Sequence, residues 1–448
     1  MMMALMALAS CTGNDLPVAP LPPEQVFPPP ADIPPIEQDL QEAKEPEPPQ
    51  MPFEGKIAIV TNTVESGEVY YRPAQHIQEK FGQEQILHRT WPVNFGTEGE
   101  YMIKILDEVA DDSDVKALII NGAVMGTNAA VHKFRERRDD VFIVYCNPSE
   151  REYSFWFLET PSNNSETGMT TVSKDDTFGF SYVVGNADLF FEWNAFDMAE
   201  PFVMQAKAMG AEAIVHYFDH SFPWRTGLEP SVARRDQMKE IAQREGISFF
   251  DLSFESGGYG AVVEHITQDA PKQVERLGVN TAFFGDSHLM QESIIRQVMA
   301  TGAIFPQPCC PSPDHGFTSA LDIQYMFPTG ELNDEGLEVM ATRTLKQTIE
   351  AISEVIAESG MSGRLSTAPM DHTMAFTYAA VEYAIKWING EVPKDKGEID
   401  MVALNQIFRD VIYEHSGVDG LGATLTPLSL DGTEYPHWIM VLQDYLVF

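Results

Sequence analysis

The sequence predicts an α/β fold of two lobes, each a doubly wound parallel sheet with helices on both faces. The first observation is that short apolar, β-branched runs, as expected of buried parallel strands, alternate with helical segments. The second is that this alternation occurs in two successive series, over residues 55–146 and 200–305. Because helices that join parallel strands form right-handed crossovers, each series is expected to build one sheet.

The first series opens with KIAIVT, an apolar run typical of a buried strand. Its strands are expected at Lys56–Thr61, Gln85–Trp91, Val115–Ile120 and Val141–Cys146, and its helices at Arg72–Phe81, Glu98–Val109 and Asn128–Arg138. Residues 151–182 then interrupt the pattern. They are polar, rich in Ser, Thr and Asn, and lack periodicity, which predicts an inserted loop or small hairpin.

The second series begins with a helix. Its helices are expected at Glu200–Met209, Ser231–Arg244, Ala261–Leu277 and Met290–Ala300, and its strands at Ala213–Phe218, Ile247–Phe254, Thr281–Gly285 and Ala303–Phe305. Further amphipathic helices are expected at Glu335–Glu358, His372–Ile388 and Met401–Glu414. Strand-like Ala423–Leu428, an Asp431-Gly432 turn and the apolar run Trp438–Phe448 predict a hairpin near the end.

The predicted domains follow from these series and from composition. They are a lipoprotein signal segment at 1–11, a Pro-rich disordered tether at 12–52, an N-terminal lobe at 53–195 with the insertion at 151–182, a second lobe at 196–330, and C-terminal helices and a hairpin at 331–448 that complete the lobes.

The N-terminal segment predicts that the protein is located outside the cytoplasm. Residues 1–10 are almost wholly apolar and end in Leu8-Ala9-Ser10 before Cys11, which resembles the bacterial lipobox, where the cysteine carries a lipid. The alternative is an apolar stub with an incidental cysteine. Residues 17–52 then hold 13 of the chain's 30 prolines, a composition that favours extended polyproline II over a packed core. We expect a protein lipid-anchored at Cys11, periplasmic or at the cell surface.

The charge balance excludes nucleic acid as a partner. The 448-residue chain carries 67 acidic and 29 basic side chains, a formal net charge of −38, so it cannot neutralise a phosphate backbone. No run of apolar residues is long enough for a transmembrane helix in the mature chain. Membrane contact is therefore expected through the lipid anchor only.

Sequence motifs of catalysis and metal binding are absent. The chain has no GxxxxGK[ST], GxSxG, HExxH or CxxC motif. Its four cysteines, in 448 residues, form neither a disulfide scaffold nor a zinc-ligand spacing. We therefore expect no catalytic residues, no cofactor and no metal.

Ligand contacts are expected on the loops that follow the strands, because open α/β sheets bind ligands at the carboxyl ends of their strands. The expected contacts are Asn62, Thr63, Ser66, Asn121, Val124, Met125 and Asn147 in the first lobe and Tyr217, Arg225, Tyr259, Asp286 and Ser287 in the second. Asparagine amides both donate and accept hydrogen bonds, which suits a polar, uncharged ligand. The alternative is that asparagine simply favours strand-ending turns.

The loop within Gly302–Phe317 adds Cys310 and His315 to the expected ligand contacts. Four prolines surround the adjacent Cys309 and Cys310 and fix an unusual backbone. The two cysteines form either a vicinal disulfide or a pair of buried thiols. A metal site here would need further ligands, for which His315 and Asp314 are the local candidates, and it is disfavoured.

Three segments together resemble a bacterial lipoprotein family, a domain of unknown function in the type I periplasmic-binding-protein clan. They are GAIFPQPCCPSPDHGF at 302–317, GMSGRLSTAP at 360–369 and NTAFFGDSHLMQE at 280–292, and the resemblance covers roughly residues 53–448. It implies two lobes joined by a hinge, with a solute in the cleft between them. Arg364 lies in one of these segments and is the preferred anchor for a ligand carboxylate.

The expected function is that of a solute-binding lipoprotein outside the cytoplasm. It captures a small polar molecule by cleft closure and passes it to an ABC permease, and it is not an enzyme. One alternative is a sensory module that signals to a membrane partner. Another is a hydrolase that uses His288 or His315 with Asp286 or Asp314. A structural surface protein is the last alternative.

Overall fold

We describe the protein from a computed structural model. The structure describes residues 52–148, 184–195, 197–219, 230–255, 257–324, 326–332, 338–430 and 432–448. The chain divides into two units, Met1–Gln50 and Met51–Phe448, and every described residue belongs to the second. The predicted signal segment at 1–11, the tether at 12–52 except its last residue, and the insertion at 151–182 lie outside the described residues.

The larger sheet of the described chain has seven strands in the order β2–β1–β3–β4–β5–β13–β12. They are β1 (Lys56–Thr61), β2 (Ile86–Thr90), β3 (Val115–Asn121), β4 (Phe142–Cys146), β5 (Leu189–Trp193), β12 (Ala423–Leu430) and β13 (Thr433–Gln443). Neighbouring strands are parallel except for β12, which pairs with β13 in an antiparallel hairpin. We call this sheet with its helices the first lobe.

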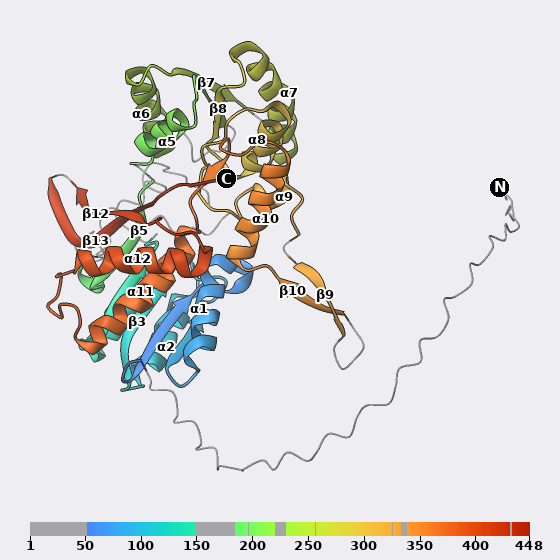
Figure 1. The fold of residues 1–448 in the computed structure, drawn as a ribbon. Helices are drawn as coiled ribbons and strands as arrows, with labels where there is room; N and C mark the ends of the chain where they lie inside the picture. The colour runs from blue at the N-terminus through green and yellow to red at the C-terminus, as the bar shows by residue number, and fades with distance from the viewer. Residues whose placement is uncertain are drawn as a thin grey trace, which may run out of the picture. The chain divides into compact units, whose positions relative to one another are not determined.

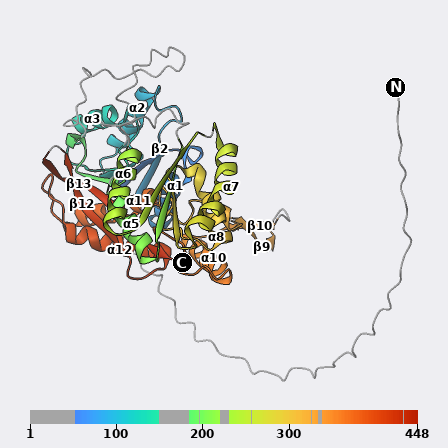
Figure 2. The ribbon, with the colours of Figure 1, turned by 90° about the horizontal axis from the view of Figure 1, so that it is seen from above.

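Helices cover both faces of this sheet, because alternate residues of its buried strands point to opposite sides. From β1, Ile57 and Ile59 pack with α1 (Glu68–Phe81), α11 (His372–Asn389) and α12 (Met401–Ser416). Ala58 and Val60 pack instead with α2 (Gly99–Ala110) and α3 (Thr127–Arg137). The two helical layers lie on opposite sides of the sheet (Figure 2).

The second sheet has its described strands in the parallel order β7–β6–β8. These are β6 (Ala213–Asp219), β7 (Ser248–Phe254) and β8 (Thr281–Gly285). Parallel bridges from Ala282 to Ile304 and from Phe305 to Leu365 extend it toward β11 (Ser366–Thr367), which pairs antiparallel with β14 (Leu446–Val447). We call this sheet with its helices the second lobe.

The second sheet is also covered on both faces. One face packs against α5 (Ala199–Ala208) and α6 (Pro230–Arg244), and the other against α7 (Tyr259–Leu277), α8 (His288–Thr301) and α10 (Leu345–Glu358). Two parallel sheets with helices on both faces confirm the predicted α/β fold of two doubly wound lobes (Figure 1).

Three segments of the described chain pass between the lobes. Residues 194–195 and 197–198 lie between β5 and α5, residues 368–371 connect β11 to α11, and residues 444–445 connect β13 to β14. The C-terminal part therefore serves both lobes: α11, α12 and the β12–β13 hairpin belong to the first, and α10, β11 and β14 to the second. Among the described helices, none combines the length and the apolar character needed to cross a membrane.

One predicted helix is wrong over its first part. The pattern predicts a helix over Glu335–Glu358, but the structure places β10 (Glu338–Thr342) there, paired with β9 (Met326–Leu332), and begins α10 at Leu345. The side chain of Thr344 accepts a hydrogen bond from the backbone of Gln347, and the side-chain oxygen of Gln347 accepts one from the backbone N–H of Thr344. This capping box fixes the start of the helix.

Candidate functional site

Asparagines that follow the strands of the first lobe meet the start of α11. The Asn121 amide nitrogen, directly at the end of β3, donates to the carbonyl oxygen of Thr373 at 3.0 Å and contacts the Thr377 hydroxyl. The amide of Asn147, after β4, lies 3.4 Å from the Asn121 amide oxygen. The strand ends thereby fix where α11 begins.

A glycine turn brings the loop after β1 and helix α1 to the same place. Gly122 has φ +83°, a left-handed conformation that glycine adopts without strain. A Cβ atom there would lie 2.9 Å from the Asn62 amide nitrogen and 3.3 Å from the Tyr70 ring. Only glycine therefore allows Asn62 and Tyr70 to approach the end of β3 so closely.

The second lobe contributes the loop 306–316, which we call the double-cysteine loop. It follows Phe305 at the carboxyl end of an extended segment of the second sheet and leads into α9 (Phe317–Ala320). Cys309 is buried and Cys310 is partly buried, and their Sγ atoms lie 3.6 Å apart as thiols. The vicinal disulfide stays a prediction. The His315 Nδ1 atom lies 2.7 Å from the carbonyl oxygen of Cys310.

Where the double-cysteine loop meets the start of α11, titratable groups of the two lobes shift one another's pKa values. Burial raises the pKa of Tyr70, and the charges of Asp371 and Cys310 raise it as well. Loss of solvent and the charge of Asp371 raise the pKa of Asp314 to about 6. Burial alone lowers the pKa of His315, but contact with Cys310 and the charge of Asp371 raise it overall. We call these five residues the inter-lobe site.

The two cysteines are electrostatically unequal. A hydrogen bond from Cys309, together with the contact with His315, holds the pKa of Cys310 well below its usual range. The same contact between the cysteines, together with burial, raises the pKa of Cys309. Of the two cysteines, Cys310 is therefore the one that loses its proton more readily.

A small pocket lies where the three crossing segments meet. The ring of Trp193 stacks on His372 with centroids 5.2 Å apart and an interplanar angle of 19°. Nδ1 of His372 is buried and forms no hydrogen bond with the described residues, and the same is true of the Gln307 amide nitrogen. The lining residues are Trp193, Met198, Pro201, Gln307, Pro311, Ala368, His372, Val441, Leu442, Gln443 and Tyr445.

Two predicted ligand contacts, Tyr217 and Arg364, have side chains that bond within the second lobe. Tyr217 is fully buried, stacks on Phe283 and donates its hydroxyl hydrogen to Asp269 at 2.9 Å. Arg364 donates to the carbonyl oxygens of Ala303 at 3.1 Å and of Val279. These carbonyls precede their strands, so Arg364 lies at the amino ends and not at the site.

Two more predicted contacts, in the first lobe, are buried. Asn121 is fully buried and its amide nitrogen bonds to α11, so it positions the helix. Val124 packs in the core of the first lobe.

The remaining predicted contacts differ in how far their side chains are exposed to solvent. Thr63 and Ser66 hydrogen-bond to each other at 3.1 Å, and Met125 and Tyr259 are exposed. Asp286 and Ser287 are buried, and Ser287 caps α8 by accepting a hydrogen bond from Leu289. Arg225 and Cys11 lie outside the described residues.

Sequence reasoning missed Asp371 and His372 as members of this region. Asp371 caps α11, because its Oδ1 accepts hydrogen bonds from the backbone of Thr373 at 2.8 Å and of Met374 at 3.4 Å. An aspartate directly before an apolar helix is a recognisable N-cap. Nothing in its sequence position, however, reveals that the same residue faces Asp314.

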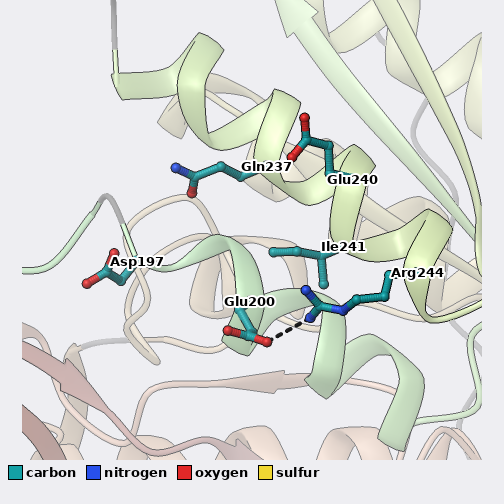
Figure 3. A pocket seen from close by; sticks show the side chains of 6 residues that line it. All are labelled: Asp197, Glu200, Gln237, Glu240, Ile241 and Arg244. Carbon is teal, nitrogen blue, oxygen red and sulfur yellow. Dashed lines mark hydrogen bonds and ion pairs between the residues drawn. The ribbon is translucent and has the colours of Figure 1, made fainter.

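A separate hollow lies on the second lobe between α5 and α6 (Figure 3). Its lining residues are Asp197, Glu200, Gln237, Glu240, Ile241 and Arg244. Arg244 pairs with Glu200 at 2.8 Å, and Asp197 accepts a hydrogen bond from Asn194 at 2.8 Å. Because Arg244 is already paired with Glu200, and Asp197 is hydrogen-bonded to Asn194, the hollow is a weaker candidate than the inter-lobe site.

Comparison with solved structures supports the fold. A crystal structure of a candidate transcriptional regulator from Clostridium difficile 630 aligns with a TM-score of 0.68 at 18% identity, over 88% of this chain and 99% of that chain. A sugar ABC transporter protein from Actinomyces odontolyticus ATCC 17982 aligns at a TM-score of 0.44 and 10% identity, over 77% of this chain and 86% of that chain.

A third structure is an ABC transporter periplasmic solute binding protein from Actinobacillus succinogenes 130z with bound D-allose. Its TM-score is 0.39 at 12% identity, over 76% of this chain and 94% of that chain. The two-lobed topology with three crossings, together with the first likeness, identifies the fold as type I periplasmic-binding-protein-like.

Sequence comparison identifies the family. A protein from Treponema pallidum (strain Nichols), described as an uncharacterized protein, is 27% identical over 164 residues, which are 37% of this chain and 60% of that relative. The chain thus spans about three fifths of the length of this curated relative. The profile of the family described as "Protein of unknown function (DUF3798)" matches residues 55–154 and 168–366. Because these residues make up more than half of the chain, the protein belongs to the DUF3798 family.

Proposed function

We propose that this protein binds a small polar solute in the cleft between its two lobes and passes it to an ABC permease. The observation that carries the proposal is the inter-lobe site. Tyr70 and Asp371 of the first lobe act on Cys310, Asp314 and His315 of the second. A solute held between polar groups of two lobes stabilises their closure, which is how hinged binding proteins work.

The site chemistry favours a neutral or cationic solute over an anion. Asp314 and Asp371 supply two carboxyl groups, Cys310 supplies a thiol whose pKa is lowered, and Tyr70 supplies a hydroxyl group. The arginine predicted to hold a carboxylate, Arg364, is occupied at the other end of the strands. A solute rich in hydroxyl or amide groups satisfies these donors and acceptors.

The location and the anchor are part of the proposal. Leu8-Ala9-Ser10-Cys11 and the proline-rich tether support a lipid on Cys11 and a position outside the cytoplasm. We expect the N-terminal peptide of the membrane fraction to carry the mass of a diacylated or triacylated Cys11. We expect Cys11→Ala to release the protein from the membrane. A membrane-bound Cys11→Ala variant contradicts the anchor.

The solute is found by native mass spectrometry of the full chain, purified gently and then denatured to release bound molecules. We expect one small molecule of defined mass, and that compound should raise the melting temperature because it binds only the folded state. Tyr70→Phe should weaken its binding about tenfold, the loss of one hydrogen bond. Tyr101→Phe, an exposed tyrosine on α2, is the matched control and should bind normally.

Two results separate this function from others. An empty protein that shows no thermal shift with sugars, nucleosides, amino acids or vitamins contradicts solute capture. A bound compound that is slowly converted, with loss of turnover in Cys310→Ser, supports a hydrolase instead. The second result is worth measuring because a cysteine of lowered pKa beside a histidine is also the arrangement of a cysteine nucleophile and its base.

A further inference from the structure

We propose that Cys309, Cys310 and His315 coordinate one soft metal cation of the Zn²⁺ or Cu⁺ class, with a fourth coordination position left for a non-protein ligand. The three side chains offer donor atoms that all lie within 4.8 Å of one another. The inference goes beyond the proposed function, because all three ligands come from one loop and the ion binds whether or not an organic solute does.

The separation of the sulfur atoms already fits one metal ion. Two thiolates that bind a tetrahedral Zn²⁺ at about 2.3 Å each lie about 3.8 Å apart. The Sγ atoms of Cys309 and Cys310 lie 3.6 Å apart. A disulfide instead requires about 2.05 Å between the same atoms. Metal binding therefore needs far less movement of this loop than oxidation does.

The hydrogen bond of His315 sets the tautomer that a metal requires. Its Nδ1 atom lies 2.7 Å from the carbonyl oxygen of Cys310. A carbonyl oxygen can only accept, so Nδ1 carries the hydrogen and the neutral ring keeps its lone pair on Nε2. Metal-binding histidines commonly donate their other N–H to a backbone carbonyl in this way.

The loop around the three ligands is rigid before any ion binds. Pro306, Pro308, Pro311 and Pro313 flank the cysteines, and all four are buried. Proline fixes φ, which restricts the backbone of this loop. A preorganised set of ligands loses little conformational entropy when it binds an ion.

The ligand types select the metal class, and the ligand number leaves one position open. Thiolate and imidazole ligands together favour Zn²⁺ and Cu⁺ over Mg²⁺ or Ca²⁺. Three protein ligands leave a tetrahedral ion one position for water or another molecule.

The test is a titration of the reduced full chain with Co²⁺, which reports its ligands by absorption. We expect one equivalent to give a near-ultraviolet sulfur-to-cobalt charge-transfer band and strong visible d–d bands of tetrahedral symmetry. Added Zn²⁺ should remove both. Cys309→Ser and Cys310→Ser should each lower the charge-transfer band by about half. His315→Ala should keep that band but weaken Co²⁺ binding at least tenfold.

Matched controls exclude the other thiols and misfolding. Cys146→Ala removes a buried thiol of β4, and Cys11→Ala removes the N-terminal one, and both should titrate like the parent protein. Circular dichroism and melting temperature show whether each variant is folded. His315→Gln gives a second, milder variant if His315→Ala unfolds.

Two outcomes overturn the proposal: no charge-transfer band at one equivalent of Co²⁺ in the parent protein, or a band that survives in the double variant Cys309→Ser/Cys310→Ser. Neither outcome bears on solute capture, because the thermal shift with organic compounds is measured separately in the presence of a chelator. A chain that binds Co²⁺ but no organic compound keeps this proposal and contradicts the proposed function.

Discussion

At Gly122 a single added carbon atom would reach the inter-lobe site through the Tyr70 ring. Its positive φ of +83° is shared by Gly210, whose φ is +87°. A Cβ atom at Gly122 meets the Asn62 amide and the Tyr70 ring, whereas one at Gly210 has no atom within 4 Å. The two glycines therefore separate the effect of backbone strain from that of displaced site residues.

We predict that Gly122→Ala costs more than Gly210→Ala. Both variants should lose about 1 kcal/mol of unfolding free energy, because alanine is strained at positive φ. Gly122→Ala should lose roughly 1–3 kcal/mol more from overpacking, and it alone should weaken binding of the solute found by mass spectrometry. Denaturant unfolding and thermal shift measure the two effects. Equal losses in the two variants, with equal solute binding, contradict the placement of Asn62 and Tyr70.

Single residues also show why part of the site could not be predicted. Tyr217 comes near the end of a strand, but successive residues of a strand point to opposite faces, and its face packs against α7. Arg364 lies in a distinctive segment, yet only the path of the chain shows that it faces the amino ends of the strands. A sequence gives strand order along the chain more readily than the direction of one side chain.

At the scale of elements, most strands were predictable because a buried parallel strand is a short apolar run between polar loops. Lys56–Thr61 and Thr281–Gly285 have the predicted bounds. Helix α1 begins at Glu68 rather than at the predicted Arg72. The prediction placed Pro73 in the first turn, where proline is tolerated, but the structure has Pro73 inside the helix. Strand β5 was not predicted, since it follows the polar segment that interrupts the pattern.

The packing of α1, α11 and α12 makes stability depend on pH. His415 of α12 stacks on Tyr378 of α11 with centroids 3.8 Å apart, and His76 of α1 lies 3.1 Å from the Tyr378 hydroxyl. Burial lowers the pKa of His415 to about 4; Glu414 opposes this shift, while His76 and Lys80 add to it. In the unfolded chain His415 therefore binds a proton near pH 6.5, whereas in the folded chain it does so only near pH 4.

We predict that this histidine makes the protein lose stability as pH falls from 6.5 to 4, because the unfolded state binds more protons in that window. The contribution is roughly 1–2 kcal/mol, allowing for partial exposure. His415→Gln should flatten the dependence by that amount in urea unfolding at several pH values. His132→Gln, an exposed histidine of α3, should leave it unchanged. If the free energy of unfolding changes with pH to the same extent in all three proteins, the result contradicts the burial of His415.

At the scale of the molecule, the chain shows how one sequence builds a site from distant parts. Tyr70, Cys310 and Asp371 are far apart in sequence but act on one another, because three crossings bring the strand ends of both lobes together. Alternating patterns predict each lobe, since each is built from local strand–helix units. They do not predict the meeting of the lobes, which depends on crossing segments that have no periodic signal.

Trp193 should report closure of the lobes, because it stands at the end of β5 where the first crossing begins. Its ring stacks on His372 beside the second crossing and also packs against the core of the second lobe that contains Met198 and Cys309. A rotation about the crossings must change these contacts. We therefore predict a change in intrinsic fluorescence when a compound that raises the melting temperature is added.

Trp193→Phe should lose this fluorescence change while it still binds the compound, as shown by a thermal shift of similar size. Trp387→Phe is the matched control, because Trp387 stacks on Phe142 within the first lobe at 5.0 Å and is not among the residues that line the pocket at the crossings. It should keep the full response. If Trp193→Phe shows the same fluorescence change as the parent protein, the change does not come from the crossing segments. The compound then binds to one lobe without closing the two lobes on each other.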